Sequence, residues 1–378
     1  MARQLSLVTA PAPGPAVLTD VWPPLRAALD GRAPLAVVPA DAGSAARARA
    51  VLRPEVPLED GADLVVLTSG STGDGRGVLL SAAALQASAT ATLDRLGGPG
   101  GWVLALPVSA VAGLQVLVRS ALADQAPAVL APGEALADAL GRAPGDRRYT
   151  ALVPTQLRRF LAAEPDALRA FDAVLVGGAA TDPALLARAR DAGVPVVTTY
   201  GMSETAGGCV YDGVPLDGVG VRAGEHGIEL SGPQLAAGYR LDPSATAEVF
   251  VDGWFRTRDA GALGSDGLLT VHGRLDDVVV TGGVNVAPAA VEAALREHPA
   301  VADAVVLGRP DAEWGARVVA AVVPSPGGAP DLAVLRSWVT ARLGAPAAPK
   351  ELHVVDAVPV LHTGKPDRRA VARLIGGA

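Results

Sequence analysis

Short β-branched runs alternate with segments rich in Ala, Leu and Arg, and this alternation constrains the fold more than any other feature of the sequence. Strands separated by helices in this way form the sheet of an α/β protein. Thr181 or Asp182 is available to cap one of the helices. We expect strands at 64–67, 77–80, 102–106, 173–176 and 194–198, and helices at 82–96, 155–161 and 183–192.

The pattern changes after Tyr239, where short polar and apolar alternations with Gly and Asp predict β-hairpins. Beyond Leu275 we expect helices at 288–298 and 331–343, strands at 304–307, 318–323 and 352–355, and a closing helix. A chain of 378 residues is too long for one ordinary core. We therefore expect a large N-terminal α/β domain with a β-rich end, residues 1–275, and a small, mobile α+β C-terminal domain, residues 276–378.

Composition excludes several classes of function. The net charge is −7 and no basic run is present, which argues against a nucleic-acid partner. The single cysteine, Cys209, excludes an intramolecular disulfide, and the five histidines lack the spacing of a zinc site. No apolar stretch is long enough for a membrane span, and prolines interrupt the N-terminus as they would not in a signal peptide. We expect a cytoplasmic protein, and a homo-oligomer remains open.

The strongest local signal is a loop of glycines and hydroxyl residues between two apolar runs. It consists of Thr68, Ser69, Gly70, Ser71, Thr72 and Gly73, followed by Asp74, Gly75, Arg76 and Gly77. Its amides and hydroxyls could surround phosphate oxygens without bulky obstruction, although composition alone fits a surface loop equally well. It is not a Walker loop, because Arg76 and Gly77 stand where that loop needs Lys and Ser or Thr, and a strand follows instead of a helix.

This loop resembles the phosphate loop of the acyl-adenylate-forming superfamily, which includes acyl-CoA synthetases, luciferases and peptide-synthetase adenylation domains. Further segments resemble that superfamily in the same order along the chain. They are Val176-Gly177-Gly178-Ala179-Ala180, Tyr200-Gly201-Met202-Ser203-Glu204-Thr205, the run from Gly253 to Gly261, the run from Gly273 to Pro288, and the run from Leu361 to Arg369, which includes Lys365. Taken singly, each of these segments would pass for an ordinary turn or hairpin.

The resemblance implies ATP, Mg²⁺ and coenzyme A as ligands and a small carboxylic acid as substrate. It places Gly178, Ala179, Ala180, Tyr200 and Gly201 at adenine, and Asp259 and Arg274 at the ribose. It makes Glu204 and Thr72 the Mg²⁺ ligands, and hard carboxylate and hydroxyl oxygens suit that ion. Lys365 becomes the catalytic cation, with Glu204 and Thr72 also acting in catalysis.

The same resemblance makes Asp276 the hinge of a C-terminal domain that turns between two half-reactions. It makes Gly282 and Gly283 a glycine strand edge beside the pantetheine channel. Three positions depart from the superfamily pattern: Arg76 stands for the usual Lys, Arg258 for a Gly, and Ala110 for a His that relatives often carry.

The segments 106–120 and 282–285 resemble the o-succinylbenzoate–CoA ligases of menaquinone biosynthesis. That resemblance implies that Arg119 meets the carboxylate that is not activated, and that Ser203 also lies at the substrate; a helix residue extended toward solvent is the other interpretation of Arg119. Three alternatives remain: another aryl or fatty acid–CoA ligase, a peptide-synthetase adenylation domain, and a nucleotide-binding protein that has lost catalysis.

Overall fold

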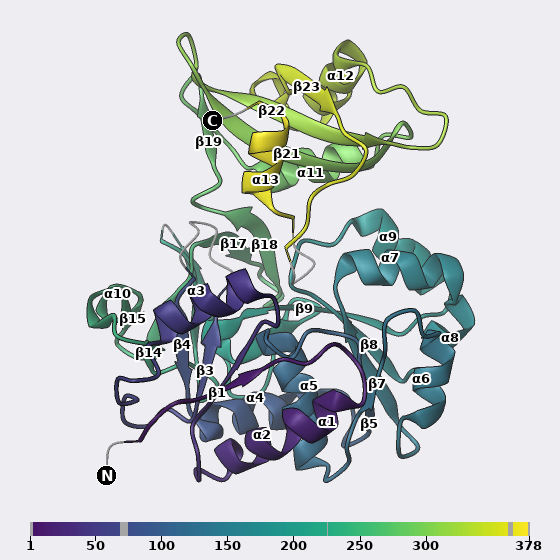
Figure 1. Cartoon of the computed structure of the whole chain (residues 1–378). Helices are drawn as coiled ribbons and strands as arrows, with labels where there is room; N and C mark the ends of the chain where they lie inside the picture. The colour runs from purple at the N-terminus through teal and green to yellow at the C-terminus, as the bar shows by residue number, and fades with distance from the viewer. Residues whose placement is uncertain (1–2, 69–74, 225, 362–365, 377–378) are drawn as a thin grey trace.

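The computed structural model describes residues 3–68, 75–224, 226–361 and 366–376, and two sheets form the main body of its large domain (Figure 1). The first sheet has the order β1-β2-β3-β4-β14. Its first three strands are parallel, and β4 and β14 are antiparallel to their neighbours. The strands are β1 (Ser6–Thr9), β2 (Leu35–Val38), β3 (Leu64–Leu67), β4 (Gly77–Leu80) and β14 (Gly238–Tyr239).

The second sheet has the order β11-β10-β9-β8-β7-β5-β6 and is parallel from β9 to β6. The strands β10 and β11 extend it as antiparallel hairpins. The strands are β5 (Gly101–Leu104), β6 (Ala128–Val129), β7 (Arg148–Leu152), β8 (Ala173–Val176), β9 (Val196–Met202), β10 (Gly207–Tyr211) and β11 (Val214–Pro215). Because β9 continues to Met202, four residues beyond the expected end, Tyr200 and Gly201 lie on a strand and not in the turn after it.

Helices fill the space between the two sheets and cover their outer faces (Figure 1). Alternate residues of β3 show the arrangement: Leu64 and Val66 face the central helices, whereas Val65 faces α3. The central helices are α1 (Ala16–Asp20), α2 (Trp22–Leu29), α4 (Ala82–Arg95) and α5 (Val111–Leu122), and α3 spans Ala42–Leu52. The outer face of the second sheet carries α6 (Leu136–Arg142), α7 (Pro154–Ala163), α8 (Pro165–Arg169) and α9 (Pro183–Asp191).

The β-rich end that the sequence predicted follows β11. A four-stranded sheet has the order β12-β13-β16-β15, and β17 and β18 form a separate hairpin. The elements are β12 (Gly220–Gly224), β13 (Gly227–Ser231), α10 (Pro243–Val249), β15 (Phe250–Val251), β16 (Trp254–Arg256), β17 (Asp259–Leu263) and β18 (Leu269–Arg274).

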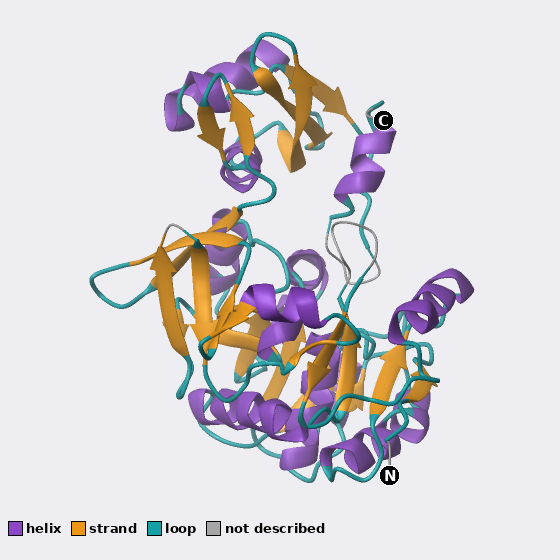
Figure 2. Cartoon of the chain, turned by 90° about the vertical axis from the view of Figure 1, so that its left-hand side faces the viewer, coloured by secondary structure: helices purple, strands orange, loops and turns teal. Residues whose placement is uncertain are grey.

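The C-terminal part forms a lobe of its own beside the large domain (Figure 2). Its sheet joins β20, β19, β22 and β21 in that order, β23 pairs parallel to β22, and α11 and α12 pack against it. The elements are β19 (Val279–Thr281), β20 (Val284–Val286), α11 (Pro288–Arg296), β21 (Val301–Asp311), β22 (Gly315–Pro324), α12 (Leu332–Leu343), β23 (Glu351–Val354) and α13 (Arg368–Leu374). The expected architecture of a large α/β domain and a small α+β domain is confirmed.

One sequence expectation in this lobe is wrong in its local form. Gly282 and Gly283 are not a strand edge but the two-residue turn of the β19–β20 hairpin, with φ of 57° and 78°. Two consecutive residues with positive φ favour Gly-Gly, because a Cβ is strained in that conformation.

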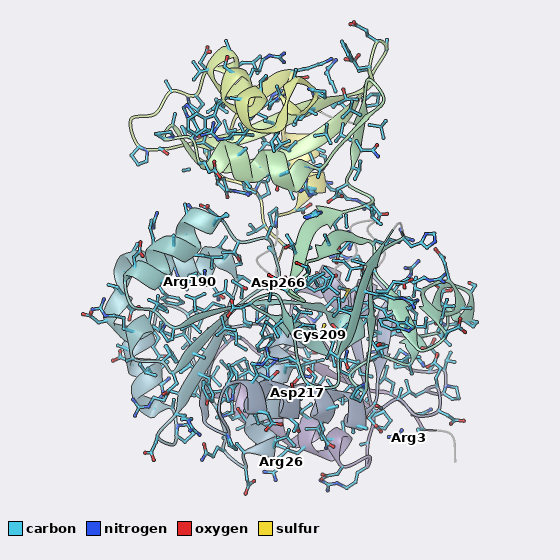
Figure 3. All side chains as sticks on the ribbon, turned by 180° about the vertical axis from the view of Figure 1, so that it is seen from behind. Arg3, Arg26, Arg190, Cys209, Asp217 and Asp266 are labelled. Atoms are coloured by element: carbon cyan, nitrogen blue, oxygen red, sulfur yellow. The ribbon has the colours of Figure 1, made fainter. Side chains whose placement is uncertain are left out.

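Apolar and charged side chains differ in exposure, as their polarity predicts. Cys209 lies inside the large domain with 1% exposure, whereas Arg26 and Arg190 lie on its surface (Figure 3). Burial raises the pKa of the Cys209 thiol to about 12, so this side chain stays a neutral thiol. Among the residues described, no helix is long and apolar enough to cross a bilayer.

Candidate active site

The predicted phosphate loop leaves the first sheet between β3 and β4. The Thr68 amide donates to the Arg76 carbonyl over 2.9 Å, and the Arg76 amide donates to Thr68 Oγ1 over 2.9 Å. At Gly75 a Cβ would stand 2.2 Å from the Thr68 carbonyl oxygen, so a side chain there would clash. The neck of the loop is therefore fixed, while Ser69, Gly70, Ser71, Thr72 and Gly73 lie outside the described residues.

Arg76, which replaces the family lysine, is held beside the loop by an aromatic ring and a carboxylate. Its guanidinium carbon lies 5.1 Å from the centre of the Tyr239 ring, and its Nε lies 3.8 Å from the Asp242 carboxylate. A guanidinium stacks on a ring better than an ammonium does. The positive charge is thus kept near the loop with a different anchor.

Glu204 is presented by a short 3₁₀ turn, Ser203–Thr205, directly after β9. Its carboxylate is buried, and the hydroxyl of Tyr239 donates to its Oε1 over 2.9 Å. Burial, together with the Glu204 charge and hydrogen bond, raises the pKa of Tyr239, so the phenol remains a donor. The half-buried Ser203 begins the same turn. A carboxylate oxygen suits Mg²⁺. Among the described residues, no group of three or more acidic, His or Cys side chains gathers here or at any other place.

The turn that carries Glu204 is supported by polar side chains from the central helices. Ala206 has a φ of 49°, which is rare for a residue other than Gly. Its carbonyl accepts hydrogen bonds from Gln115 Nε2 at 2.7 Å and from Ser88 Oγ at 3.1 Å. These buried bonds from α4 and α5 hold the turn in its strained form.

The predicted ribose residues come together at the start of β17. The Tyr200 hydroxyl donates to Asp259 Oδ2 over 2.8 Å, and Arg274 Nη1 lies 3.7 Å from Asp259 Oδ1. The antiparallel register of β17 and β18 places Asp259 directly opposite Arg274. Burial, and then the charge of Asp259, raises the pKa of Tyr200, which therefore stays neutral.

Small residues let the chain approach closely beside Tyr200. A Cβ at Gly201 would stand 2.1 Å from the Gly207 carbonyl oxygen, and one at Gly177 would stand 2.2 Å from Thr199 Oγ1. Gly178 has a φ of 81° and begins the turn that continues through Ala179 and Ala180 after β8. The carboxyl ends of parallel strands are where α/β sheets bind ligands.

The predicted hinge, Asp276, lies between two arginines. Its Oδ2 is 3.1 Å from Arg274 Nη2 and 3.3 Å from Arg258 Nη1. Gly283 lies farther along, in the β19–β20 turn, and the residues near Lys365 are anchored by a bridge between Val360 and Pro366. Lys365 itself lies outside the described residues.

Comparison with known proteins assigns the family. Residues 16–237 match the AMP-binding enzyme family, and residues 290–365 match the AMP-binding enzyme C-terminal domain. The chain belongs to the AMP-binding enzyme family. The predicted superfamily is therefore confirmed.

Several relatives of this AMP-binding enzyme have been named. A Mycobacterium tuberculosis protein described as a probable 2-succinylbenzoate–CoA ligase is 49% identical over 339 residues, which cover 86% of this chain and 88% of the relative. A 2-succinylbenzoate–CoA ligase of Geobacillus kaustophilus is 33% identical, over 85% of this chain and 72% of the relative. The solved o-succinylbenzoate CoA synthetase of Bacillus subtilis, in complex with its acyl-adenylate intermediate, superposes with a TM-score of 0.74 at 27% identity, covering 84% of this chain and 71% of that one.

Arg119, the predicted substrate residue of this AMP-binding enzyme, is buried inside the large domain. Arg119 lies on α5, one helical turn beyond Gln115, and its guanidinium carbon is 4.9 Å from the centre of the Trp102 ring. The side chain is 3% exposed, its Nε lacks a hydrogen-bond partner, and burial lowers its pKa. Within the described residues, no carboxylate forms an ion pair with it.

Three of the residues that shape this site escaped sequence analysis. Tyr239, Gln115 and Ser88 lie far from this turn in the sequence. Strand pairing brings Tyr239 to Glu204, and helix packing brings Gln115 and Ser88 to the Ala206 carbonyl. Gln115 carried a weak signal, because a polar residue within the apolar run of α5 needs a buried partner.

Proposed function

We propose that this AMP-binding enzyme joins o-succinylbenzoate to AMP with ATP and then transfers the acyl group to coenzyme A. The observation that carries the choice of acid is the 49% identity to the M. tuberculosis relative, which extends over most of both chains. The B. subtilis structure, which holds the adenylate of the same acid, supports it. This assignment would place the enzyme in menaquinone biosynthesis.

In the first half-reaction, a carboxylate oxygen of the acid attacks the α-phosphorus of ATP, and the bond from that phosphorus to pyrophosphate breaks. Two anions approach while negative charge builds on the phosphoryl oxygens, so positive charge must be supplied. We assign this role to Lys365. Glu204 and Thr72 would hold Mg²⁺, which would supply further positive charge there. The Asp259 carboxylate accepts the ribose hydroxyls, and the loop from Thr68 to Gly73 donates to the phosphates.

In the second half-reaction, the thiol sulfur of coenzyme A attacks the acyl carbon, AMP leaves with the bonding electrons, and the thiol proton is released. We propose that the small domain turns about Asp276 between the two steps. The turn carries Lys365 away and brings the Gly283 turn toward the site, where two glycines leave room for the pantetheine arm.

The second carboxylate of o-succinylbenzoate needs a partner in the acid pocket, and we assign Arg119 to it. Support comes from the unpartnered Nε and from burial, which makes an uncompensated guanidinium costly until an anion pairs with it. Because only 3% of the side chain is exposed, the residues that cover it must move when the acid binds. Arg119→Lys should raise KM for o-succinylbenzoate by about tenfold and leave KM for ATP unchanged.

The decisive experiment measures AMP release and thioester formation with o-succinylbenzoate, indoleacetate, ferulate and a medium-chain fatty acid. The last three represent the other acids named for relatives of this chain. We expect the highest kcat/KM with o-succinylbenzoate. A higher value with another acid would reassign the substrate, and AMP release with none of them would refute the enzyme activity.

Lys365→Ala tests the division of labour between the two orientations. Acyl-AMP formation should fall by about a thousandfold, whereas thioester formation from supplied acyl-AMP should retain most of its rate. Equal losses in both steps would show that Lys365 is not confined to the first one.

A further inference from the structure

Arg258 departs from the family pattern, and the structure shows what this side chain does. It lies two residues beyond the end of β16 and directly precedes Asp259, the carboxylate assigned to the ribose. Its Nη1 lies 3.3 Å from Asp276 Oδ2, and its Nη2 lies 3.8 Å from Glu248 Oε1. The amide of Leu275 also donates to the Arg258 carbonyl over 2.7 Å. Both the backbone and the side chain of Arg258 therefore hold the segment that we identify as the hinge.

A chain of alternating charges connects the ribose site to this hinge. Asp259 accepts from Tyr200 and faces Arg274 at 3.7 Å, and Arg274 also reaches Asp276 at 3.1 Å. Arg274 is thus shared between the ribose carboxylate and the hinge carboxylate. A ribose that binds at Asp259 and Arg274 competes for that shared guanidinium and weakens its contact with Asp276.

With glycine at position 258, Asp276 would then lose its main cation whenever nucleotide binds. We propose that Arg258 is a positioning residue that keeps Asp276 bound to the large domain while nucleotide occupies Asp259 and Arg274. It thereby stabilises the small domain in the orientation that the structure shows. The half-reactions named below rest on the proposed function, whereas the orientation itself does not.

The orientation held in this way also sets the direction of the described residues on either side of the Lys365 segment. In Figures 1 and 2 the flanks of that segment run from the small domain toward the large one. Arg368, at the start of α13, pairs through its Nε with Asp277 at 3.4 Å and through its Nη2 with Glu292 at 2.7 Å. The start of α13, which follows the segment, is therefore tied to the residue next to the hinge. Arg258 accordingly favours acyl-AMP formation over thioester formation.

The size of the effect follows from exposure. The side chains of Arg258 and Asp276 are 46% and 40% exposed, and ion pairs of this kind shift an equilibrium by about two- to fivefold. Salt at about 0.5 M screens such pairs strongly. The contribution of Arg258 should therefore be modest and sensitive to ionic strength.

The test combines two half-reaction rates with a measurement of domain orientation. Dyes on Ala187→Cys in α9 and Ser337→Cys in α12, both exposed positions, report the interdomain distance in a Cys209→Ala background. The parent, Arg258→Ala and Arg258→Lys are compared with Arg256→Ala. Arg256 is the matched control because it lies two residues away and pairs with Glu229 instead of Asp276.

With AMP bound, we expect a smaller fraction of Arg258→Ala molecules than of parent molecules to show the parent's interdomain dye distance. We also expect this variant to raise the ratio of the thioester rate to the acyl-AMP rate by about two- to fivefold. Arg256→Ala should match the parent, Arg258→Lys should lie between, and the parent in 0.5 M NaCl should approach Arg258→Ala. An Arg258→Ala variant with the parent's distance distribution in AMP overturns the proposal. If no acid yields acyl-AMP, the proposed function fails, and the distance distribution still decides the role of Arg258.

Discussion

The hydroxyl of Tyr239 donates to the carboxylate of Glu204 over 2.9 Å, and this bond joins the two sheets of the large domain. Tyr239 lies in β14 of the first sheet, whereas Glu204 follows β9 of the second. The phosphate loop connects β3 and β4, and β4 pairs directly with β14. A carboxylate proposed to bind Mg²⁺ is thereby fixed in position relative to the loop proposed to bind the phosphates.

Tyr239→Phe should lower kcat/KM for acyl-AMP formation by about tenfold and raise the Mg²⁺ concentration needed for half-maximal rate. A hydrogen bond to a charged group contributes about 1.5–3 kcal/mol, and its loss frees the carboxylate to change position. Tyr149→Phe is the control, because among the described residues the hydrogen bonds of the Tyr149 hydroxyl go to the carbonyls of Leu96 and Gly98 and not to a carboxylate. If the Mg²⁺ concentration for half-maximal rate equals that of the parent, Tyr239 does not support the proposed metal site.

Asp259→Asn should raise KM for ATP by about tenfold or more, because the amide keeps an acceptor but loses the charge that faces Arg274. Steady-state rates at varied ATP measure this change. Asp266→Asn makes the same substitution at an exposed turn of the β17–β18 hairpin (Figure 3) and should behave as the parent. Equal KM values for the two variants would contradict the ribose assignment.

The local sequence predicted helices and strands well where the hydrophobic periodicity agreed with the residues that begin or end such elements. β3, β4 and β8 have the expected ends, and Asp182 caps α9 through the Ala184 amide as one of the two candidates. Sequence could not predict contacts between distant segments, since those depend on strand order. Tyr239 is the clearest case: it was noted only as the point where the pattern changes, yet β14 inserts it beside β4. The turn at Gly282 was mistaken for a strand edge because a Gly-Gly pair suits both a close approach and a positive φ.

Alkaline pH should destabilise the protein through groups that stay neutral when folded. Burial raises the pKa of Cys209, Tyr200 and Tyr239, whereas the unfolded chain ionises at about 8.5 for Cys and about 10 for Tyr. The folded state then binds more protons, so stability is fully present below these values and falls above them by about 1.4 kcal/mol per pH unit for each group.

Denaturant unfolding between pH 7 and pH 11 measures this effect. The double variant Tyr200→Phe/Tyr239→Phe should show a shallower decline above pH 10 than the parent. Parallel declines for parent and variant would show that the two phenols ionise equally in both states.

Arg240→Lys should lower the free energy of unfolding by about 2–4 kcal/mol. The Arg240 side chain has no exposure, pairs with Glu59 at 2.7 Å, and donates to carbonyls of the segment after α3, including those of Arg53 and Val56. A lysine offers three donors on one atom and cannot reach all these partners. Thermal unfolding of this variant and of the exposed control Arg32→Lys measures the effect. Equal unfolding midpoints for the two variants would contradict a structural role of Arg240.

The hydrogen bond between Tyr239 and Glu204 also bears on how the two domains divide the reaction between them. The residues proposed to bind the phosphates, the metal and the ribose all lie on the large domain. The Tyr239–Glu204 hydrogen bond and the pairing of β14 with β4 fix the metal residue relative to the phosphate loop. In the proposed mechanism the large domain keeps the nucleotide fixed, and the small domain turns and so changes which reactant meets the nucleotide. Substitutions beside the hinge, for instance at Arg258, would then alter how the small domain is oriented without changing how the large domain binds ATP.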